Sequence, residues 1–242
     1  MNQSDRDRFR KAAEALGHHQ GNLLFQNEFL FDGVDFEGAA VLDIGAGDGA
    51  SSFYAACAGA RSVVSLEPEV AGSSSGMTTS FKGARDEIGA DNVELLAETL
   101  QGFDPDRRTF NVFISIASIN HLDEDACVRL QEDEDARRTY LETFGKLAEM
   151  ANPGAALVVA DCARRNAFGD LGIRNPIVPT IEWQKHQQPG FWAGLLEQAG
   201  FREPRIRWST LNTLRRPGRA LLGNRVAAYL LTSGFCLTME RG

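Results

Sequence analysis

The fold is decided by a nine-residue stretch, Val41-Leu-Asp-Ile-Gly-Ala-Gly-Asp-Gly49. Together with Ala40 before it, its first four residues form a short apolar run, residues 40–44, that is cut off by glycines, which is the pattern of a strand buried on both faces of a parallel sheet. A helix is predicted directly after it, over residues 51–58. Glycines at such a turn let the backbone approach a ligand closely, and the helix N-terminus attracts negative partial charge. The stretch therefore predicts an α/β fold with a ligand site at the turn.

Strands and helices alternate along the rest of the chain. Strands are predicted at residues 40–44, 62–66, 93–96, 110–116, 156–160, 205–208 and 235–239, and helices at 51–58, 81–88, 136–150 and 191–199. Two further helices are expected near the N-terminus: one capped by Ser4 and ending at Gly17, and one over residues 22–31. The helix over 136–150 should stop at Asn152-Pro153-Gly154. This order predicts a doubly wound, mostly parallel seven-stranded sheet with helices on both faces and an antiparallel last strand.

Composition limits the classes of function. The chain has 242 residues, 43% hydrophobic and 24% charged, which suits one globular domain. A formal net charge of −8 argues against a broad surface for nucleic acid or anionic membrane. No apolar run is long enough to cross a bilayer, and the N-terminus is too charged for a secretory signal. Four cysteines without CxxC spacing are expected to be reduced thiols of a cytoplasmic protein without a zinc site.

The glycine turn fits two ligand classes. Gly45, Gly47 and Ala50 satisfy GxGxxG/A, the dinucleotide fingerprint. Gly45, Gly47 and Gly49 together with Asp43 satisfy DxGxGxG. An acid at the end of the strand suits a ligand ammonium, directly or through water, and does not suit a pyrophosphate. The acid therefore favours the second interpretation.

A second acid supports a nucleoside ligand. Glu67 ends the second predicted strand, about 20 residues beyond the glycine turn, where a carboxylate can accept hydrogen bonds from both ribose hydroxyls. NAD enzymes use the same ribose acid, so Glu67 does not separate the two cofactors.

The DxGxGxG pattern resembles the first motif of class I S-adenosylmethionine-dependent methyltransferases. The resemblance extends from Val41 to the C-terminus, and it includes the segments 147–159, 191–201 and 235–240, which look like the family's fifth strand with its preceding helix, the helix before the sixth strand, and the antiparallel seventh strand. It implies one domain over residues 1–242, made of an N-terminal helical cap (1–38), a cofactor-binding core (39–164) and two acceptor-side insertions (165–190 and 209–234).

The same resemblance implies the cofactor-binding residues. They are Asp43, Gly45, Ala46, Gly47, Gly49, Glu67, Pro68, Glu98, Thr99, Leu100, Ser115 and Ala117. The adenine is expected near Glu98-Thr99-Leu100, where the family's usual acid is replaced by Thr99 or displaced to Glu98. Ser115 to His121 should border the methyl group, because ligands bind beyond the carboxyl ends of such strands.

Two histidines are candidates for a general base. His121, with Asn120 to orient it or the acceptor, lies in the loop after the fourth strand; the competing interpretation is a histidine that only packs or hydrogen-bonds the loop. His186 lies at helical spacing from Glu182 and Trp183, although a surface histidine is the favoured interpretation there. Asn111, which stands where relatives often have Asp, is expected to be structural.

Arginines mark the acceptor side. Arg164 and Arg165 follow the fifth strand, and the second insertion contains Arg215, Arg216, Arg219 and Arg225. Such a run suits an anionic acceptor or anionic surface, or it is the solvated face of an amphipathic helix. The acids Asp123, Glu124 and Asp125 are expected to begin a solvated helix rather than to bind a metal.

The sequence thus predicts an S-adenosylmethionine-dependent, metal-independent methyl transfer to an oxygen, or less readily a nitrogen, of a small and possibly anionic molecule. S-adenosylhomocysteine would be the product, with no nucleic-acid partner and no membrane insertion. The alternatives are a non-catalytic S-adenosylmethionine-binding subunit of a partner enzyme and an NAD(P)-dependent oxidoreductase.

Overall fold

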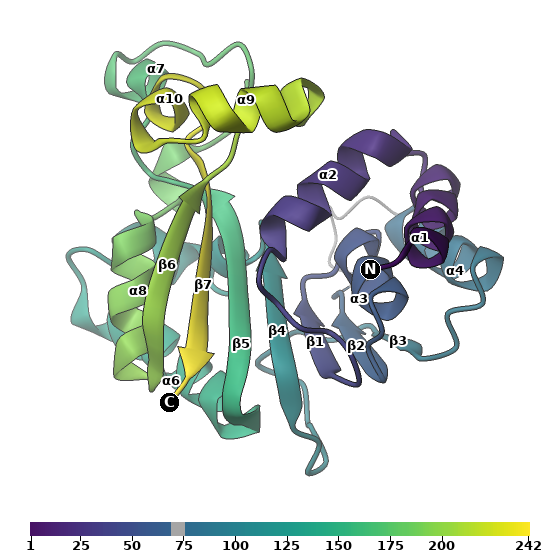
Figure 1. Ribbon diagram of the computed structural model, residues 1–242. Helices are drawn as coiled ribbons and strands as arrows, with labels where there is room; N and C mark the ends of the chain where they lie inside the picture. The colour runs from purple at the N-terminus through teal and green to yellow at the C-terminus, as the bar shows by residue number, and fades with distance from the viewer. Residues whose placement is uncertain (69–75) are drawn as a thin grey trace. The chain divides into compact units, whose positions relative to one another are not determined.

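The computed structural model describes residues 1–68 and 76–242 (Figure 1). Within these residues, seven strands form one sheet in the order β3-β2-β1-β4-β5-β7-β6, and the last strand, β7, is antiparallel to its neighbours. The predicted fold class is confirmed. By its internal contacts the chain divides into two compact units, residues 1–116 with 150–156 and residues 117–149 with 157–242. The expectation of one domain stays a prediction.

The first unit contains the parallel part of the sheet that starts at the glycine turn. Its elements are α1 (Gln3–Ala15), α2 (Gln20–Leu30), β1 (Ala40–Ile44), α3 (Ala50–Cys57), β2 (Ser62–Leu66), α4 (Met77–Glu87), β3 (Val93–Leu96) and β4 (Phe110–Ile116). β1 pairs in parallel with β2 and β4, and all five of its residues are buried. A strand with neighbours on both edges and cover on both faces is mostly apolar, and β1 is apolar except for Asp43, which is why the sequence predicts it.

The N-terminal helices pack on the helix that follows the glycine turn. α1 contacts α2, α3 and α4 (Figure 1). Tyr54 of α3 lies between Phe9 and Phe31, with ring centroids 5.2 Å from each, and all three side chains are buried. Burial of such rings contributes about 1.5–3 kcal/mol each. Helix α1 is capped by Asn2 rather than by the expected Ser4, because Asn2 and Asp5 close a reciprocal capping box.

The second unit carries the antiparallel end of the sheet and both insertions. Two elements, α6 (Glu134–Met150) and β5 (Ala151–Cys162), begin or end in the other unit; the rest are η1 (Ile119–His121), α5 (Glu124–Arg129), α7 (Ala167–Asp170), η2 (Trp183–Lys185), α8 (Pro189–Gln198), β6 (Phe201–Trp208), η3 (Asn212–Leu214), α9 (Arg215–Leu222), α10 (Arg225–Leu230) and β7 (Gly234–Arg241). Its core contains Trp192, which packs against Tyr140 and Phe144. In the described part of the chain, no helix is both long and apolar enough to cross a membrane.

Three segments differ from the sequence prediction. β5 begins at Ala151 and runs through Asn152-Pro153-Gly154, because a residue before proline favours the extended conformation and the helix passes directly into the strand. β6 begins at Phe201, with an irregularity between Arg202 and Arg205 that separates its first residues from the predicted part. The segment around Glu182 forms only the short turn η2, since a brief polar segment cannot offset the cost of starting a helix.

Candidate cofactor and acceptor sites

The glycine turn is held against the end of β2. The N–H groups of Gly45 and Ala46 both donate to the carbonyl of Leu66, at 2.8 and 2.9 Å. Gly45, Gly47 and Gly49 all have positive φ, between 57° and 88°, which favours glycine. Among the described residues, a Cβ on Gly47 would meet no atom closer than the Met77 sulfur at 4.0 Å, so none of them fills the space beside its backbone. The turn is therefore a formed cradle that a ligand can approach.

Gly49 is required by packing as well as by conformation. It has φ +88° at the N-terminal end of α3, and a Cβ there would lie 2.4 Å from the Phe81 ring and 2.8 Å from the Phe53 ring. Both rings are fully buried and pack on each other, so neither can move aside cheaply. This glycine therefore joins the turn to the hydrophobic core.

Asp43, on β1 just before the turn, is buried, with 1% of its surface exposed. Its Oδ2 accepts a hydrogen bond from the Ser52 hydroxyl of α3 at 2.6 Å, and Ser52 also contacts the Ser65 hydroxyl of β2. Burial raises the pKa of Asp43 to about 7, and the negative charges of Glu67 and Asp48 act in the same direction. In this structure Asp43 ties β1 to α3, so direct contact with a ligand ammonium would require it to leave this network.

Glu67 lies where the sequence places it. Its Oε2 accepts a hydrogen bond from the Gly47 N–H at 2.8 Å, which brings the acid of β2 onto the glycine turn of β1. Its other oxygen, Oε1, has no hydrogen-bond partner in residues 1–68 and 76–242. Pro68, the next predicted contact, is the last residue described before the gap. The geometry leaves Glu67 able to accept further hydrogen bonds.

The N-terminal segment supplies a contact that the sequence did not reveal. His18, in the connection between α1 and α2, places its Nε2 2.5 Å from Oδ2 of Asp48 in the glycine turn. Asp48 also accepts from the N–H of Ala50, the first residue of α3, at 3.2 Å. A histidine in a short interhelical connection has no distinctive sequence signal, so only the fold reveals this pairing.

The predicted adenine segment has one buried and two exposed residues. Leu100 is buried, whereas Glu98 and Thr99 are exposed. The Thr99 hydroxyl accepts from the Gly102 N–H at 3.1 Å, which is a local turn. Ser115, also predicted at the cofactor, is buried on β4. The roles of these residues stay predictions.

The loop after β4 begins with an unusual backbone conformation. Ala117 has φ +52°, which is uncommon for a residue with a Cβ, and its N–H donates to the Ala160 carbonyl at 2.7 Å. Such outliers cost about 1–3 kcal/mol and cluster at functional sites. The side chain of Asn120 follows, buried, with its Oδ1 lacking any hydrogen-bond partner among the described residues. The position and the unmet acceptor agree with a role for this loop in binding.

His121 is exposed and held in an ionic network. Its side chain is 54% exposed, and its Nδ1 lies 2.6 Å from Oε1 of Glu124. Lys185 pairs with the other oxygen of Glu124 at 2.9 Å and also with Glu182 at 2.7 Å. Hydrogen bonds from Lys185 and His121 lower the pKa of Glu124. The Nε2 of His121 is 3.4 Å from the Asn120 amide, so the two predicted partners do lie together.

His186 is not a surface histidine. Its side chain is 12% exposed, and its Nδ1 lies 3.1 and 3.2 Å from the two carboxylate oxygens of Asp161, whose side chain is 3% exposed. Asp161 lies near the carboxyl end of β5 and also accepts from the Cys162 N–H at 2.7 Å. The expected helical face of Glu182, Trp183 and His186 is absent. A buried carboxylate at Nδ1 holds the ring so that Nε2 is the acceptor nitrogen.

The remaining candidates have local structural partners. Arg164 donates to the Gln184 carbonyl, and Arg165 donates twice to Asp170. Asn111 accepts from the Ala40 N–H at 3.0 Å, which confirms its structural role. Asp123 caps α5, as expected of a helix start. Within the two described ranges, no three His, Cys, Asp or Glu side chains gather where they could hold a metal ion.

No protein-family model matches the chain, and no curated protein matches its sequence. Solved structures match its fold. A protein from Listeria monocytogenes assigned as an S-adenosylmethionine-dependent methyltransferase has a TM-score of 0.60 at 12% identity, over 93% of this chain and 100% of that one. An S-adenosylmethionine-dependent methyltransferase from Aquifex aeolicus has a TM-score of 0.56 at 18% identity, over 90% of this chain and 89% of that one. A [4+2]-cyclase has a TM-score of 0.57 at 16% identity, over 89% of this chain and 79% of that one. The chain therefore has the class I methyltransferase fold, and the cyclase is a reminder that a fold does not fix a reaction.

Proposed function

We propose that this chain binds S-adenosylmethionine and transfers its methyl group to an oxygen, or less readily a nitrogen, of a small-molecule acceptor. The observation that carries the proposal is the set of three carboxylates around the glycine turn. Asp43 lies beneath it, Asp48 within it, and Glu67 accepts from its Gly47 N–H. The chain's net charge of −8 and the nucleoside-binding character of the turn both favour a small ligand over nucleic acid.

Charge decides between the two cofactor classes. Two like charges about 4 Å apart repel by on the order of 4 kcal/mol at an effective dielectric constant of 20. A diphosphate on this turn would face Asp48, whereas an ammonium or a sulfonium would be attracted by it; Glu67 suits the ribose of either cofactor. The hydroxyl groups of a ribose would donate to the open Oε1 of Glu67, and the backbone of residues 45–49 would lie along the ligand. The residues present thus fit S-adenosylmethionine better than NAD.

We assign the general base to His186 and a positioning role to Asp161. When bound, S-adenosylmethionine supplies a methyl carbon whose bond to sulfur breaks as the acceptor oxygen bonds to it, and the sulfur keeps the electron pair. The acceptor proton passes to Nε2 of His186. Asp161 holds Nδ1 and stabilises the imidazolium that forms. His121 is less suited, because it is exposed and engaged by Glu124.

The cofactor assignment is tested by calorimetry with S-adenosylhomocysteine and NAD⁺ in separate titrations. We expect only the first to bind. Glu67→Gln should weaken it about tenfold to one-hundredfold, because a hydrogen bond to a charged group is worth roughly 1.5–3 kcal/mol. The amide oxygen can still accept from Gly47, so the turn should persist. Glu94→Gln, on the neighbouring strand β3 and exposed, is the matched control. Binding of NAD⁺ alone, or of neither compound by folded protein, contradicts the proposal.

The base assignment is tested by comparing His186→Gln with His121→Gln. Turnover of any hydroxyl acceptor that the purified chain methylates should fall by about 10²-fold or more in the first variant, since a positioned base contributes about 10²–10⁴-fold. Asp161→Asn should reproduce much of this loss and shift the pH profile of turnover, which a purely structural role would not do. A larger loss in His121→Gln would reassign the base. Binding without turnover by the purified chain would support a non-catalytic subunit instead.

A further inference from the structure

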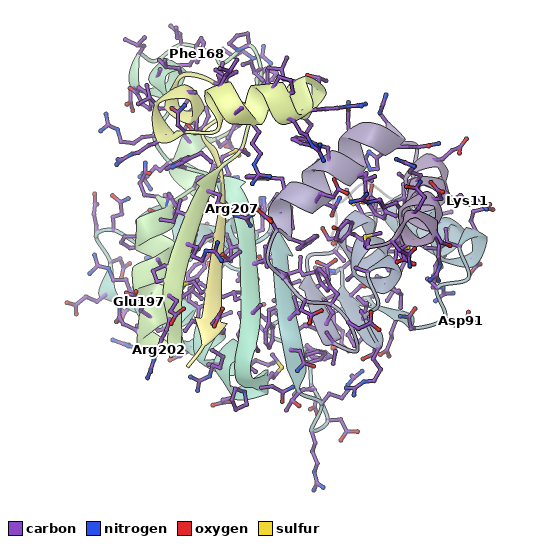
Figure 2. All side chains as sticks on the ribbon, in the orientation of Figure 1. Lys11, Asp91, Phe168, Glu197, Arg202 and Arg207 are labelled. Carbon is purple, nitrogen blue, oxygen red and sulfur yellow. The ribbon has the colours of Figure 1, made fainter. Side chains whose placement is uncertain are left out.

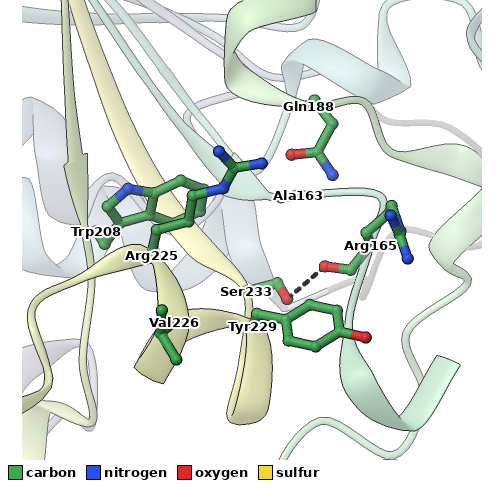
Figure 3. A pocket seen from close by; sticks show the side chains of 8 residues that line it. All are labelled: Ala163, Arg165, Gln188, Trp208, Arg225, Val226, Tyr229 and Ser233. Atoms are coloured by element: carbon green, nitrogen blue, oxygen red, sulfur yellow. Dashed lines mark hydrogen bonds between the residues drawn. The ribbon is translucent and has the colours of Figure 1, made fainter. Parts of the chain in front are cut away.

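A pocket of about 250 Å³ lies in the second unit (Figure 3). Its lining residues come from the ends of β5 and β6, from α10, and from the segments before α8 and β7: Ala163, Arg165, Gln188, Trp208, Arg225, Val226, Tyr229 and Ser233. A cavity of 150 Å³ holds benzene, so this one has room for a single substituted ring.

Two residues that line the pocket are close in sequence to the proposed base and to its aspartate. Ala163 follows Asp161 by two residues, and Gln188 follows His186 by two residues. The N–H of Ala163 donates to the Ser233 carbonyl at 2.8 Å, which fixes this part of the wall to the segment before β7. Each member of the histidine–aspartate pair therefore precedes a pocket residue by two positions in the sequence.

The two arginines of the pocket differ in what they can do. Arg165 is neutralised by Asp170, which it contacts through Nε and Nη2 and which also accepts from the Tyr229 hydroxyl. The side chain of Arg225 forms no hydrogen bond or ion pair with any residue that the structure describes. In the view of Figure 3 its guanidinium is drawn between the Trp208 ring and the Gln188 amide, which also line the pocket. The pocket thus contains one cation with its hydrogen-bonding capacity unused.

The surrounding segment adds a positive field to an acidic protein. Between residues 207 and 225 the chain has five arginines and no acid. Figure 2 marks one of them, Arg207, near the end of β6 that reaches Trp208. Arg215 and Arg216 are exposed and do not line the pocket. They therefore add to the positive electrostatic potential without contacting a ligand in the pocket. Such a local excess raises the concentration of anions at the pocket.

We propose that this pocket binds the methyl acceptor and that the acceptor is a carboxylate carried on one aromatic ring. A guanidinium binds a carboxylate through two parallel hydrogen bonds, which no other side chain does as well. The Gln188 amide adds a polar contact, and Trp208 and Tyr229 supply faces for the ring. The pocket as the acceptor site rests on the proposed methyl transfer, whereas its ligand class rests on its own residues.

The test is calorimetry of the full chain with three probes: 4-hydroxybenzoate, its uncharged analogue 4-hydroxybenzamide, and acetate. We expect 4-hydroxybenzoate to bind at least about tenfold more tightly than either of the others, because only it offers both charge and ring. Arg225→Gln should remove that preference, and Arg225→Lys should restore it in part. Arg216→Gln changes the same charge in the same segment and is the control for the general field. Thermal unfolding verifies that each variant is folded.

Several outcomes would overturn the inference. Equal affinities for 4-hydroxybenzoate and 4-hydroxybenzamide would exclude a role for the ligand's charge. Equal affinities for 4-hydroxybenzoate and acetate would exclude a role for its ring. Equal losses of 4-hydroxybenzoate affinity in Arg225→Gln and Arg216→Gln would exclude a local contact with Arg225. S-adenosylhomocysteine is titrated into the same proteins. If it binds and 4-hydroxybenzoate does not, the acceptor class is wrong and the cofactor proposal stands. If 4-hydroxybenzoate binds and S-adenosylhomocysteine does not, the anion pocket stands and the methyl transfer fails.

Discussion

Gly49→Ala is expected to destabilise the folded chain by roughly 3 kcal/mol or more. A left-handed conformation costs a residue with a Cβ about 1–3 kcal/mol, and overpacking a filled core costs a similar amount. Both apply here, because φ is +88° and the new methyl group would overlap the Phe81 and Phe53 rings. For a chain of this size each kcal/mol lowers the melting temperature by about 2–4 °C, so a fall on the order of 10 °C is expected by calorimetry or circular dichroism.

Gly83→Ala is the matched control for that substitution. Gly83 lies in the exposed middle of α4, and a Cβ there would meet no atom of residues 1–68 or 76–242 within 4 Å. Alanine should therefore leave stability unchanged or raise it by up to about 1 kcal/mol, since glycine disfavours helix interiors. If Gly49→Ala melted within about 2 °C of the wild type, the packing of the turn against the core would be wrong.

The second large effect is a dependence of stability on pH that arises at Asp43. Its pKa is about 7 in the folded chain against 3.8 for the ordinary side chain, chiefly because it is buried. Between these pH values the folded state holds a proton that the unfolded state has lost. The contribution of protonated Asp43 to the free energy of unfolding is therefore complete below about pH 4 and is lost as pH rises through 7. Its total is on the order of 4 kcal/mol.

Urea unfolding from pH 4 to pH 8 measures this effect as the difference between the wild type and Asp43→Asn. The variant cannot ionise and its amide oxygen can still accept from Ser52, so its stability should fall less with rising pH. Asp91→Asn, at an exposed aspartate, should keep the wild-type slope. Identical slopes in Asp43→Asn and the wild type would mean that Asp43 is ionised in the folded chain below pH 7.

The sequence predicted the first four strands of the sheet accurately, because β1, β2 and β4 are short apolar runs with clear ends. It predicted less well where proline lies inside a strand. Pro153 lies within β5, and Pro204 follows Glu203, whose φ of +56° disrupts the start of β6. Proline usually marks the end of an element, so both strands were predicted to start too late.

The proposed cofactor site was also easier to predict from the sequence than the proposed acceptor site. Gly47 and Glu67 each carry a local signal, and the strand order alone brings them together. Asp161 and His186 are 25 residues apart and belong to no motif, so their contact depends on how an irregular segment folds back onto β5. The pocket around Arg225 has the same origin, since its walls come from five separate segments.

The hydrogen bond from Gly47 to Glu67 has a consequence for affinity. Immobilising a glutamate side chain costs up to about 1.5–2 kcal/mol of rotamer entropy. In this protein the backbone restrains Oε2 before any ligand arrives, so that loss accompanies folding rather than association. A ribose that donates to Oε1 would meet a preorganised acceptor and would gain about tenfold in affinity over one that had to capture a freely rotating carboxylate.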